Sequence, residues 1–186
     1  MRILTFLLAF CLFAGPAAAQ MKIEVLHRRP LAEAARDGNI DVLKAQIAAN
    51  VSPNQQDLEF RPAIVAAAAN GHVEAVRILI AAKANIEGRD KGSRTGLMWA
   101  SERGHVGVVR VLLDARADVN AEERSTRMTP LMLAAREGQL QVAELLVKAG
   151  ADLALTEVTG RTALAIAEAA NKRPVAEFLR RNNAPR

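Results

Sequence analysis

The sequence predicts an all-α fold in which about five helix pairs stack into one elongated array. The first observation is a turn residue, Gly38, Gly71, Gly104, Gly138 or Asn171, that recurs every 33 or 34 residues. The second is a branched apolar residue seven positions before each turn residue, and the third is an alanine four positions before it. A period of about 33 residues is typical of stacked helix pairs.

Each unit is expected to contain a thin inner helix, a tight turn and a more apolar outer helix. Thr95, Thr129 and Thr162 stand where the N-caps of inner helices are needed, and Pro130 fits a first turn. Pro62 takes the Thr position in the second unit, so that inner helix is expected to start one residue differently. Apolar residues then recur at helical spacing in the outer segments, which predicts a face that packs against the stack.

The ends of the outer helices are also marked in the sequence. Gly150, Asn50 and Asn183 tolerate the left-handed conformation that closes a helix. Lys83 and Arg116 occupy the same slot, where a left-handed backbone costs each of them about 1 kcal/mol.

Residues 1–19 are expected to be a secretory signal peptide that is cleaved between Ala19 and Gln20. A basic start, a long apolar run and three small residues before the cleavage point are the features of such a signal. The run is shorter than the roughly 20 residues of a membrane-spanning helix. A lipidated Cys11 fits poorly, because bulky Phe10 precedes it. The mature protein is therefore expected in the periplasm or outside the cell.

The remaining residues 20–186 are expected to form one repeat domain with terminal units that act as caps. Without Arg2, 24 Lys and Arg face 20 Asp and Glu, a balance that favours solubility and, weakly, an acidic partner. The mature chain has no cysteine, so packing rather than disulfides must hold it together. The approximate repeats are residues 22–54, 55–87, 88–120, 121–154 and 155–186.

Three segments resemble ankyrin repeats: TPLMLAAREGQLQVAELLVKAGADL, TGLMWASERGHVGVVRVLLDARADVNA and NGHVEAVRILIAAKANIE. The resemblance covers all five units. It implies antiparallel helix pairs, short hairpin fingers at right angles to them, and a concave face that commonly binds proteins. The family's Thr-Pro-Leu-His motif lacks its His throughout, so apolar packing is expected to replace its polar contacts between repeats. The residues at the His position are Ala32, Val65, Met98, Met132 and Ala165.

The sequence predicts neither a metal site nor an active site, and no cofactor. His72 and His105 stand after the turn glycine of successive units, where the ring is expected to pack on the adjacent loop. A metal site needs three or four converging ligands, and no third aligned His or Cys is present. The carboxylates of Glu102, Glu123 and their neighbours alternate with arginines and are expected to be solvated. The protein is therefore predicted not to be an enzyme.

Partner-binding residues are expected at the positions that vary within the family, which are the fingertips and the two residues before each turn residue. Trp99 lies in register with Glu33, Ala66, Leu133 and Ile166, and this row is either framework or an apolar stripe for a partner. The charged positions gather in the middle units, so the site is centred on repeats three and four. The candidates are Arg89, Lys91, Arg94, Trp99, Glu102, Arg103, Glu122, Glu123, Arg127, Arg136, Glu137 and Arg161.

Together these features predict an exported module that inhibits, protects or scaffolds a periplasmic or secreted protein of acidic or mixed charge. A second interpretation is an enzyme or small-ligand-binding protein that uses the concave groove. Nucleic acid is disfavoured by the mixed charge and by the few aromatic residues. The mature form is expected not to bind membranes.

Overall fold

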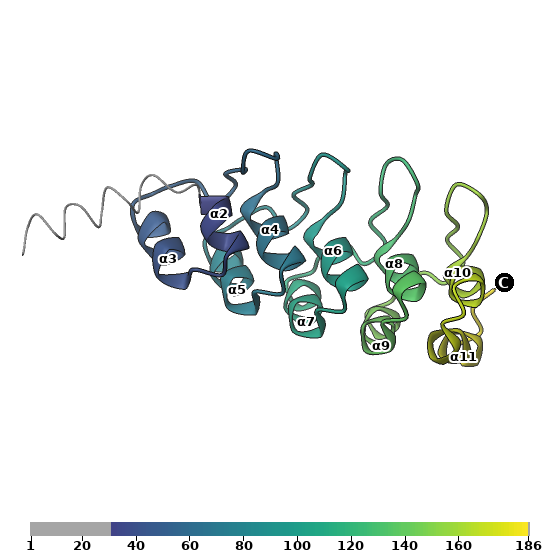
Figure 1. Cartoon of the computed structure of the whole chain (residues 1–186). Helices are drawn as coiled ribbons and strands as arrows, with labels where there is room; N and C mark the ends of the chain where they lie inside the picture. The colour runs from purple at the N-terminus through teal and green to yellow at the C-terminus, as the bar shows by residue number, and fades with distance from the viewer. Residues whose placement is uncertain (1–30, 186) are drawn as a thin grey trace, which may run out of the picture.

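A computed structural model describes residues 31–185, which form five helix pairs in a row (Figure 1). The predicted signal peptide and the start of the first unit, with His27 and Arg29, lie outside this range. The helices are α2 (Leu31–Arg36), α3 (Ile40–Ala48), α4 (Ala63–Ala69), α5 (Val73–Ala81), α6 (Gly96–Arg103), α7 (Val106–Asp114), α8 (Pro130–Glu137), α9 (Leu140–Lys148), α10 (Ala163–Ala169) and α11 (Arg173–Arg181).

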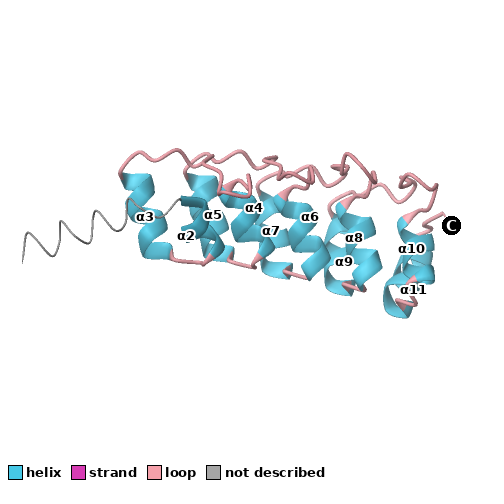
Figure 2. Cartoon of the chain, turned by 45° about the horizontal axis from the view of Figure 1, so that its top comes forward, coloured by secondary structure: helices cyan, strands magenta, loops and turns pink. Residues whose placement is uncertain are grey.

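The helices form two rows. The inner helices α2, α4, α6, α8 and α10 pack against one another in sequence order, and so do the outer helices α3, α5, α7, α9 and α11. The loops between pairs project as fingers along one edge of the array, and the short turns within pairs lie along the opposite edge (Figure 2). The predicted all-α solenoid is confirmed.

The inner helices begin at capped residues. The side-chain oxygen of Thr129 accepts a hydrogen bond from the backbone N–H of Met132 at 3.3 Å, and Thr95 and Thr162 cap their helices in the same way. Such a cap contributes about 1 kcal/mol, because it satisfies a backbone donor that the helix leaves free. All three threonines are buried, so their caps belong to the core.

The expectation that Pro62 shifts the start of its helix is wrong. Helix α4 begins at Ala63, in the register of the other inner helices, and Pro62 takes the N-cap position with an extended backbone. The fixed φ of proline suits this position, and the backbone N–H of Ala63 donates to the carbonyl of Gln55 at 3.1 Å. The second unit therefore begins its inner helix without a side-chain cap, and its finger bonds the first N–H of the helix.

The turns within pairs depend on glycine for two reasons. Gly71 has a φ of +76°, and a Cβ built there would lie 2.9 Å from Nδ1 of His105 in the next repeat. The same ring donates from Nε2 to the backbone carbonyl of Ala69 at 3.1 Å. In the preceding repeat, Nε2 of His72 donates to the backbone carbonyl of Arg36 at 2.9 Å. The predicted packing of both histidines on the adjacent unit is confirmed.

The outer helices end in a left-handed residue. The positive φ predicted for this slot is present in every repeat, at Asn50, Lys83, Arg116, Gly150 and Asn183. Lys and Arg are unfavourable in this conformation. The repeat geometry therefore overrides local preference at two of the five positions.

The core combines apolar packing with a polar ladder between repeats. Val65, Met98 and Met132, at the missing-His position, are at most 1% exposed, which confirms the expected apolar packing. Polar contacts between repeats nevertheless persist at the bases of the loops. There the backbone N–H groups of Asn85, Asp118 and Asp152 each donate to a side chain of the preceding repeat, at 2.7–2.9 Å. The acceptors are Asn54, Glu87 and Asn120.

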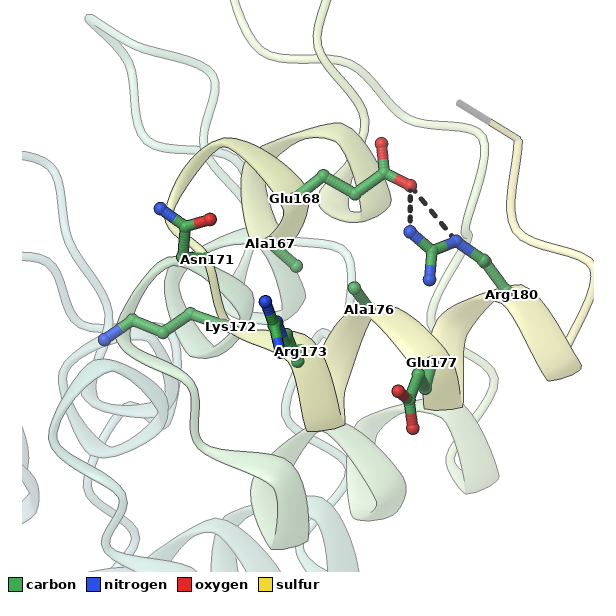
Figure 3. Close-up of a pocket in the computed structure, with 8 residues that line it drawn as sticks. All are labelled: Ala167, Glu168, Asn171, Lys172, Arg173, Ala176, Glu177 and Arg180. Atoms are coloured by element: carbon green, nitrogen blue, oxygen red, sulfur yellow. Dashed lines mark hydrogen bonds and ion pairs between the residues drawn. The ribbon is translucent and has the colours of Figure 1, made fainter.

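The last repeat presents charges where the internal repeats present small or apolar residues. Glu168 takes the register of Ala68 and Ala135, and Arg180 takes the register of Ile80. Arg180 pairs with Glu168 at 2.7 Å across an open hollow of about 580 Å³ (Figure 3). The last repeat therefore presents a polar surface on the side where the internal repeats pack against their neighbours; its role as a C-terminal cap stays a prediction. Across residues 31–185, none of the helices has both the length and the apolar character to span a membrane.

Candidate functional site

The fingers share one backbone conformation, which is held by hydrogen bonds to an acidic side chain within the finger; we call it the frame. In the finger before α6, the backbone N–H of Arg94 donates to Oδ1 of Asp90 at 2.9 Å, while Ser93 takes a positive φ. Glu157 closes the last finger by accepting from the backbone and hydroxyl of Thr159 and from Arg161. These three interactions lower the pKa of Glu157 to about 2.

Asp90 also fixes Trp99. The indole Nε1 donates to Oδ2 of Asp90 at 2.7 Å, so one carboxylate closes the finger and orients the ring. The guanidinium groups of Arg94 and Arg103 lie 4.6 and 5.0 Å from the ring centre, within the range of a cation–π contact. Trp99 is half-buried, whereas Ala66, Leu133 and Ile166 in the same row are buried. The row is framework in repeats two, four and five, whereas Trp99 and Glu33 are only partly covered.

Glu102 links two repeats through arginine pairs. Its carboxylate accepts hydrogen bonds from both terminal nitrogens of Arg94, at 2.7 and 3.3 Å, and from one nitrogen of Arg136 in the next repeat. The side chains of Arg94 and Glu102 are only 15% and 16% exposed. The expectation that Glu102 is solvated is therefore wrong. We name Asp90, Arg94, Trp99, Glu102, Arg103 and Arg136 the Trp99 cluster.

Glu123 is a second correction, because it is 9% exposed rather than solvated. Its carboxylate accepts from the hydroxyls of Ser125 and Thr126, and Arg94 lies 3.9 Å away. The finger that carries it has one more residue than the others, yet the finger-closing acids Asp57 and Glu157 of the shorter fingers are equally buried, at 8% and 5% exposed. Glu123 is thus part of the frame of its finger.

The other predicted residues lie around the cluster. Arg89 donates to the carbonyl of Glu122 at 2.9 Å, which joins the second and third fingers. Arg127 pairs with Glu122 at 3.0 Å, and this hydrogen bond raises the pKa of the guanidinium. Lys91 lies at a fingertip, with its Nζ 4.5 Å from the ring centre of Phe60.

Glu137 and Arg161 mark the far side of the predicted site. Glu137 pairs with Arg136 at 2.9 Å, and its side chain is 41% exposed. Arg161 belongs to the last finger, where it pairs with Glu157. Arg136 and Arg161 both line a hollow of about 250 Å³ between repeats four and five, with Met128, Ile166, Ala169 and Ala170.

Three surface or anchoring residues escaped the prediction. Asp90 anchors Trp99, and its role was visible in its register with the acids that close the other fingers. Leu58 and Phe60, at the first fingertip, are 86% and 56% exposed. The sequence contained little indication that Phe60 lies at the surface. An aromatic residue with a positive φ is uncommon, and Phe60 takes this conformation because of the geometry of its finger.

The described residues 31–185 contain no group of three His, Cys, Asp or Glu side chains arranged to hold a metal ion. The nitrogen atoms Nε2 of His72 and His105 are engaged by backbone carbonyls of different repeats. The finger-side surface of repeats three and four offers a fixed aromatic ring and several guanidinium groups, and a small hollow lies beside it between repeats four and five. Tryptophan and arginine side chains are enriched at protein interfaces.

Stacked helix pairs with regularly spaced fingers define a solenoid repeat protein. The family model for ankyrin repeats (3 copies) matches residues 31–123 and 122–185, and the chain belongs to the ankyrin-repeat family. Ankyrin repeats are generally protein–protein interaction modules, and proteins built from them are typically non-enzymatic. A search of curated proteins found no match to the chain.

Proposed function

We propose that the chain is an exported protein-binding module that holds a periplasmic or secreted protein against the fingers and inner helices of repeats three and four. We call this surface the finger face, and it comprises residues 89–103 and 122–137. Binding to a preformed surface would let the module inhibit, protect or scaffold its partner. The family supports binding in general, and the signal-like residues 1–19 support export.

The Trp99 cluster is the observation that carries the choice of surface. Trp99 is half-buried, whereas the smaller Ala66, Leu133 and Ile166 fill the same position in repeats two, four and five and are buried, so the stacking of repeats does not require a tryptophan there. Its ring is fixed by Asp90 and contacted by two guanidinium groups. Tryptophan and arginine are enriched among the residues that dominate binding energy at protein interfaces.

Export is tested by the mass of the protein. The protein recovered from the extracytoplasmic fraction is expected to begin at Gln20, which intact-mass spectrometry measures directly. A full-length chain that retains Met1 and stays in the cytoplasm would contradict export and leave the binding proposal standing.

The binding surface is tested with a pair of matched labels. The single cysteine of the sequence is Cys11, so a chain that begins at Gln20 has no native thiol. Glu137→Cys lies on the finger face of repeat four, and Glu144→Cys lies on outer helix α9 of the same repeat; both glutamates are exposed. Each variant loses one negative charge, and each is coupled to a bulky maleimide.

The labelled proteins are then used as baits in the extracytoplasmic fraction, with captured proteins identified by mass spectrometry. The label at position 137 is expected to block a capture that the unlabelled protein and the label at position 144 allow. The opposite pattern would overturn the choice of surface, and failure of the unlabelled protein to capture any protein would overturn the binding proposal.

A further inference from the structure

We infer that the finger face recognises an acidic segment of its protein partner, bound along repeat three from the fingertip to the C-terminal end of α6. This inference rests on the proposed function and names the chemistry of the partner.

The finger face is positive at its surface although it contains many acids. Within residues 89–103 and 122–137, Glu137 is the one exposed carboxylate. Asp90, Glu102, Glu122 and Glu123 are buried or half-buried. The exposed cations are Arg89, Lys91, Arg103, Arg124 and Arg127.

The acids are drawn inward because the fold uses them. Asp90 accepts from a backbone N–H and from Trp99, and Glu102 accepts from two arginines. Glu123 accepts from two hydroxyls of its own finger. The charge of Glu102 is therefore compensated by two guanidinium groups. The carboxylates of Asp90 and Glu123 are held by hydrogen bonds within the fold, and the exposed cations face the solvent.

The outer helices provide an internal comparison. Helices α5, α7 and α9 expose three acids and three bases: Glu74, Arg77, Arg110, Asp114, Glu144 and Lys148. The balanced outer surface is what solubility alone requires. The imbalance on the finger face is thus not shared by these three helices, although outer helix α11 of the last repeat also exposes more bases than acids, with Arg173, Arg180 and Arg181 against Glu177.

Repeat three holds the cations that are best prepared to bind a carboxylate. Arg103 donates from Nη1 to the carbonyl of Ala69 at 2.6 Å and contacts the ring of Trp99, and it has no carboxylate partner within residues 31–185. Lys91 rests over Phe60 and likewise has no carboxylate partner in the described part of the chain. A cation held on an aromatic ring loses less freedom on binding, which favours affinity.

The neighbouring first fingertip, which Lys91 contacts from the second finger, adds an apolar requirement. Leu58 and Phe60 are 86% and 56% exposed, and Lys91 lies over Phe60. A nucleic-acid duplex keeps its bases stacked inside the helix and offers this tip little to pack against. A polypeptide with carboxylates beside a large apolar side chain complements both features, so the occupant is an acidic protein segment.

The test uses a random linear-peptide phage library selected on the immobilised mature protein. We expect the selected peptides to be enriched in Asp and Glu next to a large apolar residue. Synthetic copies of these peptides should bind the variant Lys91→Glu/Arg103→Glu at least about tenfold more weakly, because like charges then oppose each other. The control Arg77→Glu/Arg110→Glu changes the net charge equally on the outer helices and should alter affinity less than about threefold, through long-range attraction only.

A charge swap shows that the weakened variant is still folded. Peptides in which Lys replaces each acid should bind Lys91→Glu/Arg103→Glu better than they bind the original protein. The single variant Lys91→Glu, which changes a fingertip side chain, should weaken the acidic peptides in the same direction by a smaller factor.

Several results would overturn the inference. The first is a set of selected peptides without enrichment in Asp and Glu. The second is an equal loss of peptide affinity in the inner and outer double variants. The third is a charge-swapped peptide that does not bind the variant Lys91→Glu/Arg103→Glu better than the original protein. Tighter binding of duplex DNA or of anionic phosphatidylglycerol vesicles, lost in the same variant, would assign the surface to those partners. If peptides fail in these ways while the label at position 137 still blocks capture, the proposed function stands and only the acidic chemistry falls.

Discussion

Repeats three and five have the same frame but place their charges on different surfaces. In both, an acid closes the finger and a threonine caps the inner helix, through Asp90 and Thr95 in one and Glu157 and Thr162 in the other. Repeat three exposes Arg103 on the finger face, and repeat five has Ala170 at the same position.

On the C-terminal side of each repeat the distribution of exposed charges is reversed. Val106 and Leu113 of repeat three pack against the core, whereas Arg173 and Arg180 of repeat five are exposed at the end of the array. The comparison shows that the shared motif specifies the frame. What a repeat contributes beyond the frame depends on which surface carries its charges.

The largest effect is expected when the end of repeat five is given the residues of an internal repeat. The triple variant Glu168→Ala/Arg173→Val/Arg180→Leu exposes apolar surface of the kind that internal repeats bury, at about 2 kcal/mol for each large side chain when a second copy covers it. Sedimentation velocity should detect concentration-dependent association. The same three types of change on the outer helices, Glu144→Ala/Arg110→Val/Arg77→Leu, should leave the protein monomeric. A triple end variant that stays monomeric at high concentration would mean that the charges are not what ends the array.

A large loss of stability is expected at the turn shared by repeats two and three. Gly71→Ala places a Cβ 2.9 Å from the His105 ring in a left-handed backbone, whereas Gly150→Ala has the same backbone cost and nothing within 4 Å. Urea denaturation should show a loss of about 3 kcal/mol for Gly71→Ala and about 1 kcal/mol for Gly150→Ala. Adding His105→Ala to Gly71→Ala should cost less than the sum of the two single changes. Equal losses for the two glycine variants would contradict the contact with His105.

A smaller effect, a gain in folding stability, is expected from a change in the interface between repeats three and four. The hydroxyl of Ser101 is buried and has no hydrogen-bond partner among residues 31–185, and its counterparts are Ala35, Ala68 and Ala135. Ser101→Ala removes an unsatisfied polar group and should stabilise the protein by about 1 kcal/mol in urea denaturation. Ala68→Ser should introduce the same penalty in repeat two. A destabilised Ser101→Ala would show that the hydroxyl contributes an interaction to this interface.

The smallest effect concerns the last finger and depends on pH. Because the pKa of Glu157 is lowered to about 2 in the fold, its charged form adds stability above the pKa of the unfolded chain. That stability is lost as the pH falls from about 4.5 towards about 2. The melting temperature of Glu157→Gln should therefore lie below that of the original protein at neutral pH and converge with it in acid. A constant difference across this range would contradict the role of the charge.

The frame was predictable because each of its parts depends on neighbours in the sequence. The spacing of Gly71 and Gly104 gave the turns, and Thr95 and Thr129 gave the helix starts. Even the histidine contacts followed from their place after the turn glycine. The start of α4 was predicted wrongly, because Pro62 keeps the common helix start without a side-chain cap, and the contact of Ala63 with the carbonyl of Gln55 depends on the finger.

The candidate site was predictable in its location but not in its internal contacts. The burial of Glu102 depends on Arg136, which lies 34 residues away and approaches only when repeats stack. Glu123 is buried because it closes its finger, as Asp57 and Glu157 do in fingers of ordinary length. Trp99 was recognised as ambiguous, and its orientation is set by Asp90, whose side chain is aimed by the closing of the finger. In each case the decisive contact is with a loop or a neighbouring repeat.

The most direct test of the account is the hydrogen-exchange footprint of the captured partner on the mature protein. If the finger face holds the partner, binding should slow amide exchange in residues 89–103 and 122–137 and leave the outer helices α7 and α9 unchanged. Protection confined to α7 and α9, with the finger face exchanging as in the free protein, would contradict the account.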